Sequence, residues 1–209
     1  LEYLRLDGNH IESMSVVALL SMLRELTISN NRISFIGAVA RLAALEELDL
    51  SWNDISDIDV VGGLVNLKSL KLSSNNISRV GAVAGLASLI ELDLSHNQIK
   101  MGNRDAMPLS NLRNLERLSL AGAEIKQDNL EEILSLTRLK YLDLSATDIN
   151  RFWCIERLFN LGALIHGSVL NISYTPGLDK NCNDYKYNMS VLDSLEKNGV
   201  SVLRWVKSD

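Results

Sequence analysis

The stretch Leu45-Glu46-Glu47-Leu48-Asp49-Leu50-Ser51-Trp52-Asn53-Asp54-Ile55 decides the fold, because its spacing of leucines and its closing asparagine recur along the chain. A shift of 22 residues aligns it with one copy that begins at Leu23 and with another that begins at Leu67. Self-similarity at such a fixed period is the sequence signature of a solenoid, in which each unit stacks on its neighbours.

The repeating unit can be written L-x-x-L-x-L-x-x-N-x-I, and eight copies follow one another. They begin at Leu1, Leu23, Leu45, Leu67, Leu89, Leu115, Leu139 and Gly167. The sixth and seventh copies have Ala123 and Thr147 in place of the asparagine, and the eighth is degenerate. The first five copies are spaced by 22 residues, whereas the later intervals are 26, 24 and 28. The four extra residues of the 26-residue interval lie within residues 100–109, where Gly102 and Pro108 predict a bulge on the convex or descending side.

Each copy alternates apolar and polar residues in its central part. Leu48 and Leu50 point to one side of the chain, while Glu47, Asp49 and Ser51 point to the other, which predicts a short half-buried strand. One unit buries too few apolar side chains to offset the ordering of its own backbone. The units must therefore stack, with their strands paired in parallel on one face.

These features resemble the leucine-rich repeat family, and the resemblance covers nearly the whole chain. Units such as Leu72-Ser73-Ser74-Asn75-Asn76-Ile77-Ser78 are similar to the subtype shared by protein-phosphatase regulators and bacterial internalins, while the later copies look like divergent bacterial or protist repeats. The resemblance implies an α/β solenoid shaped as a curved horseshoe, with a parallel β-sheet on its concave face and short 3₁₀ or α segments on its convex face. It implies a fold more than a function.

An asparagine occupies the end of each strand in the first five copies, namely Asn9, Asn31, Asn53, Asn75 and Asn97. An amide side chain both donates and accepts hydrogen bonds. We therefore expect these residues to form a structural ladder that satisfies backbone groups where the chain turns, each contributing on the order of 1–3 kcal/mol.

Three connections are long enough for α-helices, at residues 13–23, 128–139 and 149–161, with Asp128 and Asn150 as N-caps of the last two. The others predict 3₁₀ turns. We expect residues 1–188 to form the repeats, with an N-terminus that is truncated because Leu1 already lies inside a copy. Residues 189–209 form the expected C-terminal cap, a helix at 190–198 that Ser190 begins and Gly199 ends, then a strand at 200–206. Such a cap indicates a natural C-terminal end.

The 209 residues are 46% apolar and 22% charged, which is typical of one folded domain. A net charge of −5 and a pI near 5.3, without a basic face, argue against a nucleic-acid partner. A membrane span would need an uninterrupted apolar run of about 18 residues, and the sequence contains none.

Cys154 and Cys182 occupy the same position of adjacent units, so a disulfide and two buried thiols both remain open. Two cysteines are compatible with a cytoplasmic and with a secreted protein, and a cytoplasmic location is slightly favoured over an extracellular one.

Nothing in the sequence predicts catalysis, a metal site or a cofactor. His10, His96 and His166 are scattered, and there is no glycine-rich phosphate loop or metal-ligand motif. We therefore expect a protein that is not an enzyme and that needs no cofactor.

The third and fifth positions of each copy should line the concave face. The third positions are Tyr3, Glu25, Glu47, Ser69, Glu91, Arg117, Tyr141 and Val169, and the fifth are Arg5, Thr27, Asp49, Lys71, Asp93, Ser119, Asp143 and Asn171. Six acidic residues and three basic residues make this face acidic, which would steer a basic partner toward it. The alternative, that aspartate and serine only fill recurring L-D-L-S units, stays open.

The eighth position carries Trp52, where the other copies have Gly8, Asn30, Ser74, His96, Gly122, Ala146 and Tyr174. Tryptophan and tyrosine are enriched at binding hot spots. The predicted partner-binding residues are Tyr3, Arg5, Glu25, Glu47, Asp49, Trp52, Lys71, Glu91, Asp93, His96, Arg117, Tyr141, Asp143 and Tyr174. Together they predict a non-catalytic module that binds a protein or peptide with a basic patch. The alternative is a targeting, sensor or adhesion segment of a larger enzyme, effector, receptor or surface protein.

Overall fold

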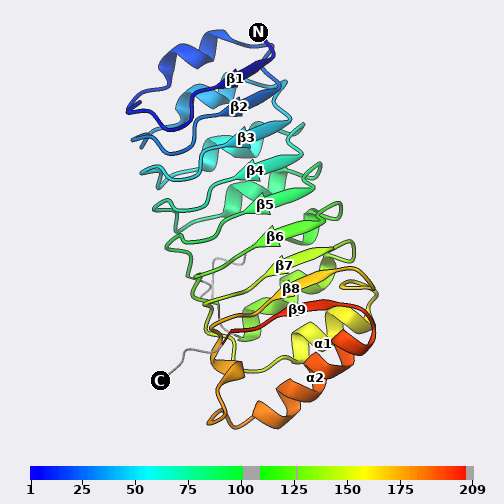
Figure 1. Ribbon diagram of the computed structural model, residues 1–209. Helices are drawn as coiled ribbons and strands as arrows, with labels where there is room; N and C mark the ends of the chain where they lie inside the picture. Colours follow the sequence, from blue (N-terminus) through cyan, green and yellow to red (C-terminus); the bar gives the residue numbers. More distant parts are fainter. Residues whose placement is uncertain (101–108, 126, 206–209) are drawn as a thin grey trace.

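The computed structural model describes residues 1–100, 109–125 and 127–205, and in these ranges nine short strands form one parallel sheet in chain order (Figure 1). The strands are β1 (Tyr3–Arg5), β2 (Glu25–Thr27), β3 (Glu47–Asp49), β4 (Ser69–Lys71), β5 (Glu91–Asp93), β6 (Arg117–Ser119), β7 (Tyr141–Asp143), β8 (Val169–Asn171) and β9 (Ser201–Leu203). Eight of them are the strands of the predicted copies, and β9 follows the last copy. The expected solenoid with a parallel sheet is confirmed.

The register of the sheet follows the repeat. Between β3 and β4, Glu47 pairs with Ser69 and Asp49 pairs with Lys71, so that equivalent positions of neighbouring units lie side by side. The intervening Leu48 is only 1% exposed and points into the core. Alternation of buried and exposed residues is thus the property that aligns the third and fifth positions on one face.

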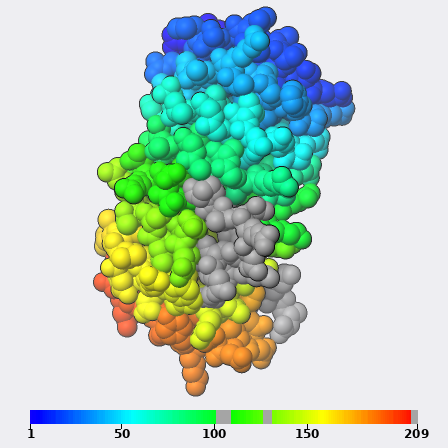
Figure 2. Space-filling model, turned by 180° about the vertical axis from the view of Figure 1, so that it is seen from behind, coloured from blue at the N-terminus to red at the C-terminus, as the bar shows by residue number. Residues whose placement is uncertain are grey.

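The opposite side of the solenoid carries 3₁₀ turns, and Figure 2 shows this side of the molecule as a space-filling surface. They are η1 (Ser15–Leu19), η2 (Gly37–Arg41), η3 (Asp59–Gly63), η4 (Gly81–Gly85), η5 (Leu109–Asn111) and η6 (Gln127–Ser135). In each of the first four, a valine at the centre of the turn is buried in the core. The expected side of the solenoid and its 3₁₀ character are therefore confirmed.

Two of the three predicted α-helices, at residues 13–23 and 128–139, are wrong, because the 3₁₀ turns η1 and η6 occupy these segments. In η1, for example, the N–H of Leu20 donates to the carbonyl of Val17, which is the tighter i to i−3 bond. The third is confirmed as α1 (Trp153–Asn160), but Phe152 rather than Asn150 is its N-cap residue. The side chain of Asp128 and most of the expected bulge, residues 101–108, lie outside the described residues.

The asparagine ladder is present as expected. Asn53 is 7% exposed, accepts a hydrogen bond from the N–H of Ile33 at 2.9 Å, and donates to the carbonyls of Ile28 and Leu50 at 3.1 Å each and of Ser51 at 3.2 Å. Equivalent bonds are made by Asn31, Asn75 and Asn97. Each amide therefore joins its own unit to the preceding one.

The C-terminal end consists of η7 (Pro176–Leu178), α2 (Tyr185–Lys197) and β9. The helix begins five residues before the predicted Ser190, whose hydroxyl instead donates to the carbonyl of Tyr187 at 2.7 Å inside the helix. Its end is as predicted, since Gly199 adopts a φ of +81°. The strand β9 is shorter than predicted, and residue 206 lies outside the described residues. The division at residues 188 and 189 stays a prediction.

Asn188 ties α2 to the repeats. It is fully buried, accepts a hydrogen bond from the N–H of Phe152 at 3.0 Å, and donates to the carbonyls of Asn150 at 2.8 Å and Gly177 at 3.0 Å. Cys154 is buried and Cys182 is partly exposed; both are thiols, and no disulfide joins them in the described structure.

No helix in the ranges that the structure describes is both long enough and apolar enough to cross a membrane.

Candidate functional site

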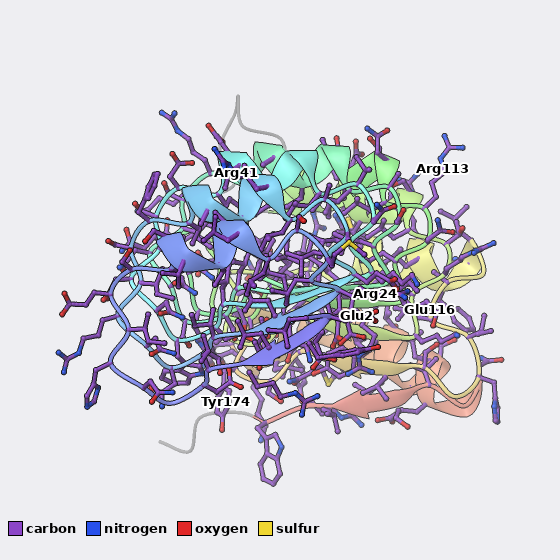
Figure 3. All side chains as sticks on the ribbon, turned by 90° about the horizontal axis from the view of Figure 1, so that it is seen from above. Glu2, Arg24, Arg41, Arg113, Glu116 and Tyr174 are labelled. Carbon is purple, nitrogen blue, oxygen red and sulfur yellow. The ribbon has the colours of Figure 1, made fainter. Side chains whose placement is uncertain are left out.

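The concave face is the exposed side of the sheet, formed by the third and fifth positions of the units. Figure 3 looks along the stack of units and places Tyr174 on the side of the sheet opposite Arg41, which belongs to η2. The strand register brings the predicted third- and fifth-position residues together in two columns, while Trp52, His96 and Tyr174 lie just beyond the strand ends.

All three basic residues of the two columns are paired with glutamates. Arg5 Nη2 lies 2.7 Å from Glu25 Oε1. Glu91 lies between two cations, with Lys71 Nζ at 3.7 Å from one oxygen and Arg117 Nε at 3.3 Å from the other. Such exposed pairs add little stability, but they neutralise part of the acidic field that the sequence predicts.

The aspartates at the fifth position have a structural role as well. Each accepts a hydrogen bond from the N–H two residues later: Asp49 from Ser51 at 2.9 Å, Asp93 from Ser95 at 3.0 Å and Asp143 from Ser145 at 2.9 Å. These bonds fix the turn after the strand. The alternative that aspartate serves the L-D-L-S unit therefore accounts for one oxygen of each residue.

Some carboxylate oxygens of the two columns have no hydrogen-bond or ion-pair partner among the described residues, and their negative charge is open to a partner. Asp49 Oδ2 and Asp93 Oδ2 receive no hydrogen bond from the described residues, and Glu47 forms no ion pair or hydrogen bond with them. By contrast, the second oxygen of Asp143 accepts from Tyr141 and Asn171. The open charge is thus concentrated on β3 and β5.

A polar depression of about 270 Å³ lies over β5, β6 and β7. Its lining includes Glu91, Asp93, Arg117, Tyr141 and Asp143. The guanidinium carbon of Arg117 is 4.6 Å from the centre of the Tyr141 ring, and the Tyr141 hydroxyl donates to Asp143 at 3.2 Å. Burial raises the pKa of Tyr141, and the negative charge of Asp143 raises it further, so the phenol stays protonated at neutral pH.

Every eighth position is left-handed. The φ values run from +53° to +74° at Gly8, Asn30, Trp52, Ser74, His96, Gly122, Ala146 and Tyr174. Glycine and asparagine tolerate this conformation, whereas for a bulky side chain it is unusual. Trp52 nevertheless adopts a φ of +57° and leaves 65% of its surface exposed, and Tyr174 is 53% exposed.

Two exposed residues near the C-terminal end escaped the sequence reasoning. The N–H of Tyr174 donates to the carbonyl of Trp205 at 2.7 Å, and Trp205 is 68% exposed. Leu203 pairs with Asn171 and extends the fifth-position column to β9. Aligning the strand after α2 with the repeats would have found both residues.

The sequence reasoning also missed a row of charges at the second position, where the strands begin. Glu46 bonds both Arg24 and Lys68, the latter at 2.5 Å, and Glu116 lies 2.7 Å from Lys140. Hydrogen bonds from Lys68 and Arg24 lower the pKa of Glu46. Figure 3 shows Arg24 and Glu116 at the same edge of the sheet as Glu2.

A family model described as leucine rich repeat matches residues 1–55 and 57–99, and a second model of the same description matches residues 88–112. Together they cover slightly more than half of the 209 residues. The chain belongs to the leucine-rich repeat family. The search of curated proteins finds no match.

Solved leucine-rich repeat proteins share the whole fold. An internalin C2 from Listeria monocytogenes gives a TM-score of 0.78 at 22% identity, over 98% of this chain and 80% of that one. An internalin F from the same bacterium gives 0.73 at 25% identity, over 99% and 62%. A leucine-rich repeat protein of Leptospira interrogans gives 0.71 at 22% identity, over 96% and 54%. The predicted similarity to internalins is confirmed at the level of the fold.

A plant receptor also shares part of the architecture. The leucine-rich repeat ectodomain of the receptor kinase GASSHO1/SCHENGEN3 from Arabidopsis thaliana, solved in complex with CASPARIAN STRIP INTEGRITY FACTOR 2, gives a TM-score of 0.61 at 24% identity. The match covers 78% of this chain and 20% of the ectodomain chain.

Leucine-rich repeat proteins commonly mediate protein–protein interactions, and the family and its fold are generally non-catalytic. Among the described residues, no three histidine, cysteine, aspartate or glutamate side chains gather as they would around a metal ion. The exposed Trp52 with its positive φ and the open acceptors of Glu47, Asp49 and Asp93 all lie on or beside the concave face.

Proposed function

We propose that the chain is a non-catalytic binding module that holds a protein or peptide on its concave face, with a basic patch of the partner over β3 to β5. The proposal goes beyond the general behaviour of leucine-rich repeat proteins because it assigns a face, an anchor and a charge. The conformation and exposure of Trp52 carry it.

Trp52 is unfavourable for the free protein. The left-handed conformation costs a residue with a side chain roughly 1–2 kcal/mol, and a ring that is 65% exposed recovers little of this by burial. The neighbouring units place Asn30 and Ser74 at the same position, which shows that the turn does not require an aromatic residue. Strain retained at an exposed aromatic residue is typical of an interface anchor.

Open negative charge lies close to this anchor along the chain. Glu47 and Asp49 precede Trp52 in the same unit, and they have acceptor oxygens that no described residue uses. A basic partner would supply the missing donors and would be attracted from a distance. The net charge of −5 disfavours a nucleic-acid partner by the same reasoning.

The decisive experiment replaces Trp52 by asparagine, the residue of the preceding unit. The partner is purified by its association with the full chain, and the Kd is measured by calorimetry for both forms. Loss of a hot-spot aromatic residue should raise the Kd by about tenfold or more. The free energy of unfolding of Trp52→Asn should be no lower than that of the wild type and should exceed it by up to about 0.5–1 kcal/mol, because asparagine tolerates a positive φ.

Phe35→Ala is the matched control, since Phe35 is 79% exposed but its ring lies against Gly37 at the start of η2, away from the strands. It should leave the Kd unchanged. Glu47→Arg should weaken binding by reversing the open charge. An unchanged Kd for both Trp52→Asn and Glu47→Arg would rule out the concave face as the binding site.

A second candidate is that the chain acts as the targeting, sensor or adhesion segment of a larger enzyme, effector, receptor or surface protein. It is supported by the coverage of the solved relatives, because the chain spans 62% of internalin F and 20% of the receptor-kinase ectodomain. Sequencing the gene on both sides of this segment decides the matter, since a larger protein requires an open reading frame that continues into another domain.

A further inference from the structure

The guanidinium of Arg117 lies on the concave face between a carboxylate and an aromatic ring. Its guanidinium carbon lies 4.6 Å from the centre of the Tyr141 ring, and its Nε lies 3.3 Å from Glu91 Oε1. The three residues are in register on β5, β6 and β7, so that the carboxylate, the guanidinium and the ring follow one another across three adjacent strands. The Arg117 side chain is 53% exposed and can leave without disturbing the core.

The surroundings of the guanidinium are fixed independently of it. The Tyr141 hydroxyl donates to Asp143, which is 9% exposed and also accepts from Ser145 and Asn171. The Tyr141 ring therefore keeps its place if Arg117 moves. Asp93 lines the same depression and has one oxygen that no described residue uses.

We propose that an arginine side chain of the partner takes the place of the Arg117 guanidinium, between Glu91 and the face of the Tyr141 ring. An aromatic face beside a carboxylate is the arrangement in which proteins bind guanidinium groups, because the cation is attracted by the ring and donates to the oxygens. Arg117 is then an internal competitor that lowers the affinity of the face for basic partners. This inference rests on the proposed function and adds the chemistry of one subsite.

Arg5 provides a matched comparison on the same face, because it lies on β1 and outside the β3 to β5 region that the proposed function assigns to the partner. It is the other arginine of the two columns, it pairs with Glu25 at 2.7 Å, and its side chain is 74% exposed. No aromatic ring among the described residues stacks on it. Replacing Arg5 changes the net charge exactly as replacing Arg117 does, but it uncovers no ring.

The test titrates the full chain with a tri-arginine peptide and measures the Kd by NMR chemical-shift changes. Arg117→Gln should bind the peptide about three- to fivefold more tightly than the wild type, since one stacking site becomes available. Arg5→Gln should stay within about twofold of the wild type, because an exposed charge alone contributes little. In the double variant Arg117→Gln, Tyr141→Leu the gain should disappear, and tri-lysine should show a smaller gain than tri-arginine.

Equal gains for Arg117→Gln and Arg5→Gln would show that only net charge matters and would overturn the proposal, as would the absence of any gain for Arg117→Gln. Thermal melts verify that each variant is folded. Arg117→Lys gives a second measurement with the charge retained, and it should bind between the wild type and Arg117→Gln. These titrations need no identified partner, so their failure is distinct from a failure of the Trp52 test of the concave face.

Discussion

Single residues hold neighbouring units together, and Asn53 shows how. Its side chain satisfies the N–H of Ile33 and the carbonyl of Ile28 in the preceding unit, together with two carbonyls of its own unit. Asn53→Ala would leave buried backbone groups without partners, and we expect it to lower the free energy of unfolding by about 2–3 kcal/mol. Urea denaturation followed by circular dichroism measures this difference.

Asn9→Ala is the control for that change. Asn9 is exposed and donates only to the carbonyls of Leu6 and Asp7 in its own unit. Water can replace both bonds, so the loss should be below about 1 kcal/mol. Equal losses for the two variants would contradict a role for the ladder in joining units.

The sequence predicts the role of Asn53 but not all the roles of Asp49. An amide recurring at the end of a strand has a ready physical explanation, because it both donates and accepts hydrogen bonds and so satisfies the backbone groups of the turn. An aspartate at the fifth position, such as Asp49, can hydrogen-bond the turn, attract a partner, or do both. Only the structure shows that one oxygen of Asp49 accepts from Ser51 while the other stays open.

At the level of elements, the 3₁₀ turns pack closely enough to require glycine. A Cβ atom placed on Gly85 in η4 would lie 2.5 Å from the carbonyl oxygen of Gly62 in η3. Because that neighbour is backbone, Gly85→Ala must shift one turn away from the other, and we expect a loss of about 1–3 kcal/mol in unfolding free energy. Thermal and urea denaturation both report it.

Gly63→Ala is the matched control, since it lies one repeat earlier and a Cβ atom there would meet nothing within 4 Å. It should be neutral or stabilise the protein by up to about 1 kcal/mol, because alanine restricts the unfolded chain. If Gly85→Ala proved as harmless as Gly63→Ala, the close approach of η3 and η4 could not be limiting the choice of residue.

The elements also show why some helices were predicted wrongly. Apolar spacing in residues 13–23 fits an α-helix and a 3₁₀ turn equally well, and the packing of Val17 against the core selects the turn. Likewise, α2 begins at Tyr185 rather than Ser190. Asn188 must lie inside the helix to reach Phe152 and Gly177, and such a contact across 36 residues leaves no local signal.

Across the whole molecule, the fixed register turns residues 22 apart into neighbours. Parallel pairing and the buried leucines follow from the repeat, and both were predicted. The ion pairs depend in addition on the side-chain conformations, which the repeat does not determine. Glu91 pairs with Arg117 across 26 residues and with Lys71 across 20. The net charge of the columns is unchanged by these pairs, but the negative charge that stays unpaired is confined to fewer residues than the columns alone imply.

The second-position charges that link units along the edge of the sheet predict how the stability of the whole stack depends on pH. Hydrogen bonds from Lys68 and Arg24 lower the pKa of Glu46 below its usual 4.5. A carboxyl group with a lowered pKa in the folded state stabilises the protein above its unfolded pKa, and this contribution is lost as pH falls through the folded pKa. The Tm should therefore fall between about pH 5 and pH 3, and Glu46→Gln should show a shallower fall over that window.

Glu2→Gln at the same position of the first unit is the control, because Glu2 forms no ion pair among the described residues, and it should follow the wild-type curve. Parallel curves for Glu46→Gln and the wild type would mean that the ion pairs along this edge do not contribute to stability. The same comparison in 1 M salt should bring the curves closer together, since exposed pairs are screened.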